Sequence, residues 1–185
     1  MQIQMVESTT KLPLHIKSQL VSLYNLAFPR VSPRIPRNIA WLDETSQKRV
    51  RFLLLNKSIV VSHAAVLTKN FRHADTQYLL AGFGGVMTHP DFRKKGFGSQ
   101  IINRAARFID KQNFDVAVLF CHRNHEVFYR RSGWEILAND DIFINEGTPI
   151  PQPQDELAMI RYISEKAIRN RERFENLPVY FGEAW

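Results

Sequence analysis

A turn that combines basic residues with glycine, PDFRKKGFGS at residues 90–99, is the feature that most restricts the fold of this chain. Before the turn, the apolar residues at 78–81 and 86–87 are typical of a β-strand, and Pro90 ends that run because it lacks a backbone donor. After it, apolar residues recur at helical spacing: Phe97, Ile101, Ile102, Ala105, Phe108 and Ile109. The turn therefore connects a strand to an amphipathic helix.

The residues of this turn are suited to binding an anion. Gly96 and Gly98 have no Cβ, so an anion can approach the backbone and the chain can adopt a positive φ there. The first N–H groups of the following helix have no internal partner, and the helix dipole adds partial positive charge. Arg93, Lys94 and Lys95 add full charges. The turn predicts a pyrophosphate site; the alternative is a solvated basic loop that happens to contain glycine.

Two common nucleotide-binding motifs do not fit this turn. A Walker loop needs Gly-x-x-x-x-Gly-Lys followed by Ser or Thr, and the chain has no such run. A dinucleotide fingerprint needs three glycines as Gly-x-Gly-x-x-Gly, but Ile101 stands where the third glycine would be. The sequence therefore favours neither a P-loop nor a Rossmann fold.

Two motifs resemble the GNAT superfamily of N-acetyltransferases. Arg93-x-x-Gly96-x-Gly98 is similar to the core motif of that family, and residues 128–134, FYRRSGW, are similar to its aromatic-Tyr-x-x-x-Gly-aromatic segment. The resemblance implies an α/β GNAT fold, with a mixed, mostly antiparallel central sheet, a splayed strand pair and flanking helices. It also implies acetyl-CoA as co-substrate and no metal.

The hydrophobic pattern predicts the order of elements along the chain. We expect strands at 3–6, 50–55, 58–67, 77–88, 116–121, 134–137 and 157–163, and helices at 14–28, from Gly96 onward, and at 126–131. Residues 56–57 are predicted to turn a hairpin, and residues 29–38, rich in proline and arginine, to form a loop or broken helix. The proline-rich residues 147–153 predict either a hairpin loop or a lid over the substrate.

Composition limits the class of protein. A chain of 185 residues with 44% hydrophobic content predicts one domain, residues 1–185, with a substantial core. No run is long enough to span a bilayer and no signal peptide is evident, which predicts a cytoplasmic protein. The single cysteine, Cys121, excludes an internal disulfide. The net charge of +7 suits a ligand with several phosphates, and equally a nucleic acid.

The cofactor contacts are predicted partly from the residues and partly from the resemblance. Gly82, Gly84 and Gly85 are poor strand formers and indicate a bulge or a close backbone approach, although a glycine-rich strand can also simply accommodate a bulky neighbour. In the family, the corresponding backbone binds pantetheine and directs an N–H at the thioester oxygen. The resemblance therefore implies cofactor contacts from Val86, Met87, Thr88, Arg93, Lys94, Lys95, Gly96, Phe97, Gly98 and Ser99.

Tyr129 is the candidate catalytic acid. A tyrosine hydroxyl stays protonated at neutral pH and can donate to a departing thiolate, which is the role that the family commonly gives to the tyrosine of this motif. The alternative is a core tyrosine with its hydroxyl at the surface. The general base stays open among His63, His89, His122 and Glu126. A covalent route through Cys121 is disfavoured because free cysteine is usually a small buried apolar residue.

Three segments resemble aminoglycoside 2'-N-acetyltransferases more closely: residues 59–66, residues 147–156 and the C-terminal GEAW. This resemblance implies substrate contacts at Gly84, Gly85, Asp155 or Glu156, Glu183 and Trp185. A C-terminal tryptophan that only fills the core is the alternative for Trp185.

The chain also departs from those enzymes. Gly84 stands where they place an acid, and the first loop carries Arg30, Arg34 and Arg37 where they place aspartates. Such a loop would repel a polycation and attract an anion. We therefore predict a small-molecule amine as substrate in preference to an aminoglycoside, with an acidic group on that amine as an option.

Two other classes of function stay open. A non-catalytic CoA-binding module would keep the turn at 93–99 and lose transfer, and Tyr129 argues against it. A nucleic-acid-binding protein would use the net charge, but the basic residues are scattered and match no nucleic-acid motif. We predict that the protein binds a small molecule and neither nucleic acid nor a membrane. A homodimer is an option.

Overall fold

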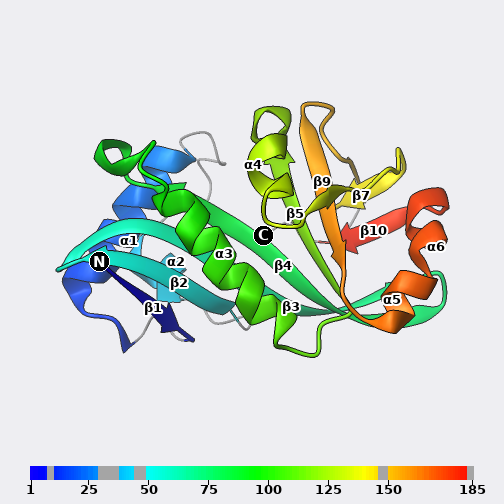
Figure 1. The fold of residues 1–185 in the computed structure, drawn as a ribbon, viewed down its shortest axis with the longest axis horizontal. Helices are drawn as coiled ribbons and strands as arrows, with labels where there is room; N and C mark the ends of the chain where they lie inside the picture. The colour runs from blue at the N-terminus through cyan, green and yellow to red at the C-terminus, as the bar shows by residue number, and fades with distance from the viewer. Residues whose placement is uncertain (8–10, 29–37, 44–48, 146–149, 183–185) are drawn as a thin grey trace. The chain divides into compact units, whose positions relative to one another are not determined.

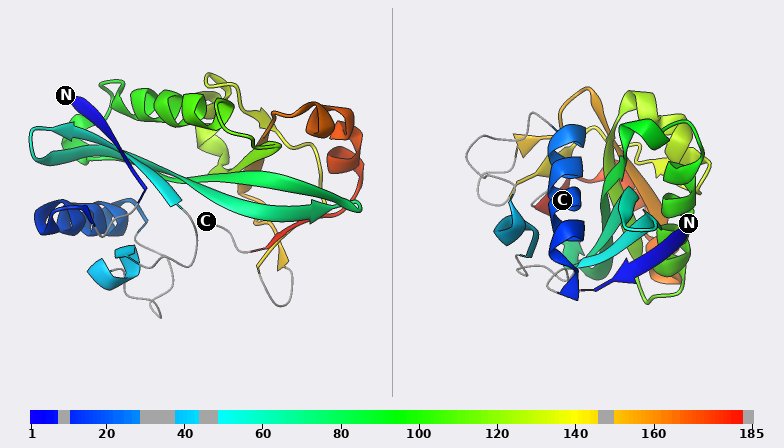
Figure 2. Two further views of the ribbon diagram at one scale, coloured as in Figure 1. Left: turned by 90° about the horizontal axis from the view of Figure 1, so that it is seen from below. Right: turned by 90° about the vertical axis from the view of Figure 1, so that its left-hand side faces the viewer.

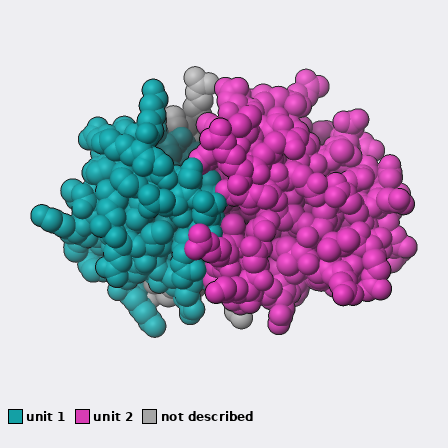
Figure 3. Space-filling view, in the orientation of Figure 1, with its two compact units in different colours: residues 1–67, 85–105 teal, residues 68–84, 106–185 magenta. Residues whose placement is uncertain are grey.

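The structure is a computed structural model that describes residues 1–7, 11–28, 38–43, 49–145 and 150–182. The chain divides into two compact units, which are coloured separately in Figure 3: residues 1–67 with 85–105, and residues 68–84 with 106–185. We call them unit 1 and unit 2. Two long strands and one helix contribute residues to both (Figure 1).

Seven strands form one hydrogen-bonded sheet in the order β1-β2-β3-β4-β5-β9-β6. Their bounds are β1 (Gln2–Val6), β2 (Arg49–Asn56), β3 (Ile59–His73), β4 (Thr76–Thr88), β5 (Val116–His122), β9 (Glu156–Tyr162) and β6 (Glu135–Ile136). Neighbours β1 and β2, β2 and β3, β5 and β9, and β6 and β9 run antiparallel, whereas β4 and β5 run parallel. The predicted mixed, mostly antiparallel sheet is confirmed. The predicted hairpin is confirmed too, with its turn one residue later than expected, at residues 57–58, where Lys57 has φ 54°.

Helix α1 (Leu14–Ala27) covers one face of the strands of unit 1. Its apolar stripe buries Ile16, Leu20 and Leu23, which join Leu53 and Val60 of the sheet in one hydrophobic cluster. Figure 2 shows α1 and the beginning of α3 (Phe97–Asp110) on opposite faces of these strands. The sequence predicted both helices because each has a continuous apolar stripe at helical spacing.

Two short helices complete unit 1. Helix α2 (Ile39–Asp43) follows the predicted loop at 29–38, of which residues 29–37 lie outside the described part of the chain. Lys17 on α1 pairs with Asp43 on α2 at 2.6 Å. The 3-10 helix η2 (Pro90–Phe92) stands between β4 and the glycine turn, with Pro90 at its start where no donor is needed.

Strand β5 lies in the core of unit 2. Unit 2 also contains a second sheet of three strands in the order β10-β7-β8. The elements not yet introduced are η3 (Arg123–His125), α4 (Glu126–Arg130), β7 (Ile142–Ile144), β8 (Ile150–Pro151), α5 (Glu165–Arg169), α6 (Arg171–Asn176) and β10 (Val179–Gly182). A cluster around Phe71, Val118, Phe174 and Phe181 fills the core. The sequence predicted α4, but not the second sheet or α5 and α6.

These elements escaped prediction because they are short and gain their stability from partners distant in sequence. Strand β10 pairs parallel with β7, and Phe143 and Ile144 pair with Pro151 and Ile150 of β8. The proline-rich segment at 147–153 therefore contributes one strand of a hairpin; residues 146–149 lie outside the described part. Among the helices that the structure describes, none is long and apolar enough to cross a bilayer.

Candidate functional site

The turn after β4 presents unpaired backbone donors beside basic side chains. Lys94 and Gly96 have φ values of 59° and 79°, and α3 begins directly afterwards at Phe97. Within the described part of the chain, the N–H groups of residues 94–99 donate to no backbone or side-chain acceptor. Successive N–H groups in alternating right- and left-handed backbone form a concavity that suits an anion, and the dipole of α3 adds to it.

The basic side chains of this turn are exposed and partly ordered. The Arg93 Nε donates to the Thr88 carbonyl at 3.1 Å, and the Lys95 ammonium donates to the Asp91 carbonyl at 2.9 Å. Lys95 also lies 5.5 Å from the centre of the Phe92 ring. None of these contacts involves a carboxylate, so the positive charge of Arg93 and Lys95 stays available to a bound anion.

The end of β4 is bent at Gly85, the residue before the predicted pantetheine contacts. Gly85 has φ 59°, and a Cβ there would overlap the Tyr24 hydroxyl and lie 3.2 Å from His63 Cε1. The ladder between β4 and β5 comprises Leu80, Ala81 and Gly82, with no later residue of β4. The close backbone approach that the glycines predicted is confirmed at Gly85.

Side chains of β3 hold the residues that follow the bend. The Ser62 hydroxyl donates to the Met87 carbonyl at 2.7 Å and lies 3.0 Å from the Thr88 hydroxyl. The backbone N–H of His89 donates to the Val61 carbonyl at 2.9 Å. Met87 is buried, whereas Val86 and Thr88 are half-buried, so the backbone from 86 to 88 is fixed and remains partly accessible.

A buried polar cluster of Tyr24, Arg51 and His63 lies behind Gly85. His63 Nδ1 lies 2.7 Å from the Gly85 carbonyl oxygen, so Nδ1 carries the proton and donates. Nε2 is then the acceptor, and Arg51 Nη1 donates to it at 3.4 Å and to the Tyr24 hydroxyl at 3.1 Å. Sequence reasoning named His63 as a candidate base and missed the other two, because nothing in the local pattern brings α1, β2 and β3 together here.

The environment of His63 keeps its ring neutral. Complete burial, followed by the nearby Arg51 charge, lowers the pKa of His63 to about 3. Its one lone pair is directed at Arg51, so the ring is not free to accept a proton from an amine. Of the four candidate bases, His63 is therefore assigned a structural role.

The low pKa of His63 predicts acid sensitivity. Between pH 6.5 and about 3 the unfolded chain binds a proton at this position and the folded chain does not, so stability rises with pH across that window and is lost on acidification. From pH 6.5 to pH 4 we expect this residue to lower the free energy of unfolding by about 3 kcal/mol. Urea titrations of wild type and His63→Gln at both pH values measure it. His63→Gln should show the smaller loss, and an equal loss in both proteins would contradict the assignment.

The other candidate bases make local contacts. The Nδ1 atoms of His89 and His122 accept backbone N–H groups from Asp91 and Asn124, each at 3.3 Å, and thereby cap η2 and η3. Glu126 pairs with Arg130 one helical turn away at 2.6 Å. These contacts single out no general base among the described residues.

Tyr129 lies in α4 of unit 2 with 8% of its surface exposed. Its ring packs edge-on against Phe83 and Phe128, with centroids 6.4 Å and 5.3 Å away, and Trp134 stacks on Phe83 at 5.4 Å. The hydroxyl has no hydrogen-bond partner within the described part of the chain. Burial, with Cys121 nearby, raises the pKa of Tyr129 well above its usual range, so the hydroxyl keeps its proton.

The one cysteine is not an activated nucleophile. Cys121 Sγ lies 3.8 Å from the sulfur of Met159. Burial, reinforced by Glu156 and Glu126, raises the pKa of the Cys121 thiol to about 11. The thiolate is the nucleophilic form, so this thiol is inert near neutral pH.

The predicted substrate residues are only partly described. Gly84 and Gly85 lie on β4, and Asp155 lies immediately before β9 with its side chain 72% exposed and 3.9 Å from His122 Nε2. Burial, together with Asp155, raises the pKa of Glu156. Glu183, Trp185 and the basic loop with Arg30, Arg34 and Arg37 lie outside the described residues.

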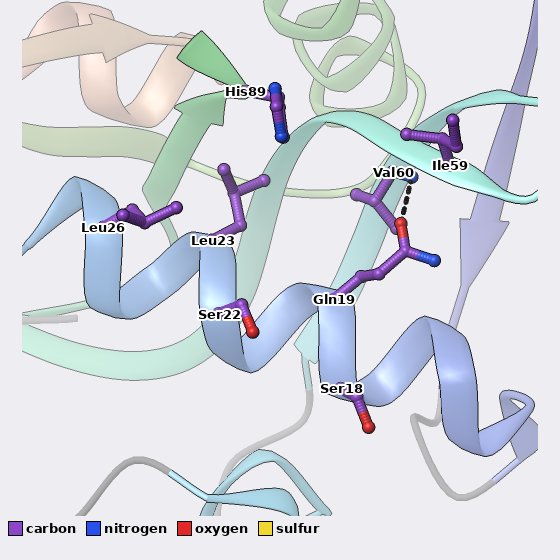
Figure 4. A pocket seen from close by; sticks show the side chains of 8 residues that line it. All are labelled: Ser18, Gln19, Ser22, Leu23, Leu26, Ile59, Val60 and His89. Atoms are coloured by element: carbon purple, nitrogen blue, oxygen red, sulfur yellow. Dashed lines mark hydrogen bonds between the residues drawn. The ribbon is translucent and has the colours of Figure 1, made fainter. Parts of the chain in front are cut away.

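A separate depression of about 230 Å³ lies on unit 1 between α1 and β3 (Figure 4). Gln19 spans it: its side chain accepts from the Val60 N–H and donates to the Ser58 carbonyl, each at 2.8 Å. The residues that line it are Ser18, Gln19, Ser22, Leu23, Leu26, Ile59, Val60 and His89. This depression includes neither the glycine turn nor the buried cluster.

A family profile described as "Acetyltransferase (GNAT) domain" matches residues 16–137, a range that includes both sequence motifs. The chain belongs to this family. The predicted GNAT fold is confirmed by solved structures of similar fold. A search of curated proteins gave no match. Among the described residues, no group of three or more His, Cys, Asp or Glu side chains is placed to hold a metal ion.

Three solved structures illustrate the similarity of this GNAT domain to others. Escherichia coli ElaA has a TM-score of 0.60 and 17% identity, over 86% of this chain and 98% of that one. An acyl-CoA N-acyltransferase from Pseudomonas aeruginosa has a TM-score of 0.60 and 16% identity, over 86% and 99%. An aminoglycoside 6'-N-acetyltransferase complexed with coenzyme A has a TM-score of 0.58 and 12% identity, over 87% and 97%.

Proposed function

We propose that this GNAT protein is an N-acetyltransferase that moves an acetyl group directly from acetyl-CoA to the primary amine of a small molecule. The observation that carries the proposal is the turn at residues 93–99, where free N–H groups, two residues with positive φ and three basic side chains precede α3. Family membership supports it, as do the neighbours described as an N-acyltransferase and as a coenzyme A complex. A single-domain organisation and a cytoplasmic location belong to the same proposal.

The residues present fit coenzyme A. Its pyrophosphate suits the N–H groups of residues 95–99 and the charges of Arg93, Lys94 and Lys95. Its pantetheine arm suits the accessible backbone of Val86, Met87 and Thr88, which Ser62 holds in place. The bend at Gly85 opens that backbone, because a residue with positive φ interrupts the regular strand.

The proposed reaction needs two proton transfers. The amine nitrogen forms a bond to the thioester carbonyl carbon, the carbon–sulfur bond breaks, and the bonding pair leaves with sulfur. Tyr129 donates its proton to that sulfur, and the proton lost by the amine restores Tyr129 through solvent. Transfer is direct, since the raised pKa of the Cys121 thiol removes a covalent route.

Acetyl-CoA binding provides the first test. At 100 times the dissociation constant, a ligand stabilises the folded state by about 2.7 kcal/mol, which raises the melting temperature of a chain of this size by about 5–10 °C. The double variant Arg93→Gln, Lys94→Gln should lose most of that shift. Arg169→Gln, which removes an exposed charge on α5, should retain it. No shift in the wild-type protein at saturating acetyl-CoA would contradict cofactor binding.

Release of free coenzyme A thiol during incubation with a panel of amines separates an enzyme from a binding module. Thiol release with at least one amine is expected. A melting shift without release for any amine would favour the non-catalytic alternative. Efficient transfer to kanamycin or gentamicin would favour the aminoglycoside alternative, for which the C-terminal resemblance is the argument.

A further inference from the structure

Arg51 is a buried cation whose contacts within the described part of the chain are to neutral groups. It lies on β2 in unit 1, and only 4% of its surface is exposed. Nη1 donates to the Tyr24 hydroxyl and to His63 Nε2, and the guanidinium carbon lies 6.0 Å from the centre of the Tyr24 ring. Within the described residues, Nε and Nη2 have no acceptor and the guanidinium has no carboxylate partner.

Two arginines of unit 2 are neutralised by carboxylates. Arg161 pairs with Asp110 at 2.7 Å, and Arg171 pairs with Glu135 and Glu175, each at 2.8 Å. Arg51 is more deeply buried than either, yet among the residues that the structure describes it donates to a hydroxyl oxygen and an imidazole lone pair and to no carboxylate. Because a buried charge without a counter-ion is costly, a site of this kind gains from binding an anion.

The described neighbours of Arg51 carry no negative charge and fix the orientation of its guanidinium. The lowered pKa of His63 keeps that ring neutral, and its Nδ1–H is held by the Gly85 carbonyl. Tyr24 packs edge-on against His63 with ring centroids 5.3 Å apart. The guanidinium is therefore oriented by two rigid groups, which is the condition for a forked, two-point contact with a carboxylate or phosphate.

The cluster also lies beside the backbone that we assign to the pantetheine arm of coenzyme A. His63 and Tyr24 both contact Gly85, which immediately precedes Val86, Met87 and Thr88, and all of these residues belong to unit 1. A molecule held at Arg51 would thus have its other end close to the thioester carbonyl.

We propose that Arg51, oriented by Tyr24 and His63, binds an acidic group of the acceptor, so that the substrate is an amine that also carries a carboxylate or phosphate. This rests on the proposed N-acetyltransferase function. It is independent of the basic loop at 29–37, which suggested the same substrate class from sequence alone.

The test compares matched acceptors on the full-length protein. The panel pairs each common amino acid with its amide, and phosphoethanolamine with ethanolamine. Activity is measured as the release of coenzyme A thiol. In the wild-type protein the acidic member of a pair should be preferred. Arg51→Met should lower kcat/KM for that acid by about 10- to 100-fold, as loss of a charged hydrogen-bonded contact does. The same substitution should leave kcat/KM for the matching amide nearly unchanged. Preference for carboxylate or for phosphate distinguishes the two anions.

Two controls separate this effect from loss of folding. Arg72→Met removes an exposed arginine near the C-terminal end of β3. It should change neither the acceptor preference nor the stability of the protein. The melting shift with acetyl-CoA should persist in Arg51→Met, and Arg51→Lys, which keeps the charge but not the fork, should lose less activity toward acids. Preference of the wild type for neutral amines, or an equal fall for acid and amide, would overturn the proposal.

The anion site can also be judged without turnover. If no amine is acetylated although acetyl-CoA binds, the proposed enzymatic function fails. The melting temperature is then measured with N-acetyl amino acids, N-acetylphosphoethanolamine and the uncharged amide of each acid. A rise with an acid and not with its amide, lost in Arg51→Met, supports the site. The lack of any acid-specific rise in the wild type counts against it.

Discussion

Gly85→Ala is expected to lower the free energy of unfolding by about 2–5 kcal/mol. Two costs combine: an L-residue at φ 59° is strained by about 1–2 kcal/mol, and overpacking of a well-filled site adds about 1–3 kcal/mol. The added Cβ would overlap the Tyr24 hydroxyl and approach His63, and both side chains are held in place by hydrogen bonds. Urea unfolding of the purified variant measures the loss.

Gly96→Ala is the matched control for this prediction. Gly96 has φ 79°, but a Cβ there meets no heavy atom within 4 Å. Only the backbone strain remains, so we expect a loss of about 1–2 kcal/mol. The difference between the two losses of unfolding free energy therefore measures the cost of crowding the close packing behind β4. Equal losses would show that Tyr24 and His63 move aside without cost.

Tyr129→Phe is expected to lower kcat by about 100-fold or more, the usual contribution of a positioned general acid. The substitution removes one oxygen and keeps the ring, so the packing against Phe83 and Phe128 is retained. Since the hydroxyl has no hydrogen-bond partner in the described part of the chain, its loss leaves no buried group unsatisfied. Steady-state kinetics should show a fall in kcat with little change in KM for acetyl-CoA.

Tyr162→Phe provides the matched control. Tyr162 on β9 is also a partly buried tyrosine, its hydroxyl also lacks a hydrogen-bond partner among the described residues, and burial likewise raises its pKa. It packs against Phe174 in the core of unit 2, and no motif assigns it to the site. Its replacement should leave kcat unchanged. An unaltered kcat in Tyr129→Phe would remove Tyr129 as the acid, and a fall in both variants would point to a general effect on unit 2.

The parts of the fold that the sequence predicted correctly are those with strong local patterns. The strand, turn and helix around residues 90–99 follow from proline, glycine and an apolar stripe, which act through backbone geometry within a few residues. The end of β4 could be predicted as irregular because Gly82, Gly84 and Gly85 are poor strand formers. The second sheet could not, because β7, β8 and β10 are short and depend on pairing between distant segments.

The candidate site divides in the same way. The sequence by itself determined the family motifs, the glycine-containing turn at residues 93–99 and the tyrosine of residues 128–134, because each depends on neighbouring residue types. Only the tertiary structure decided that Tyr24, Arg51 and His63, from a helix and two strands, meet behind Gly85. It also decided that His63 is neutral and that Arg51 has no acidic partner among the described residues. Burial and charge compensation depend on what surrounds a side chain in space, and residues distant along the chain supply those surroundings.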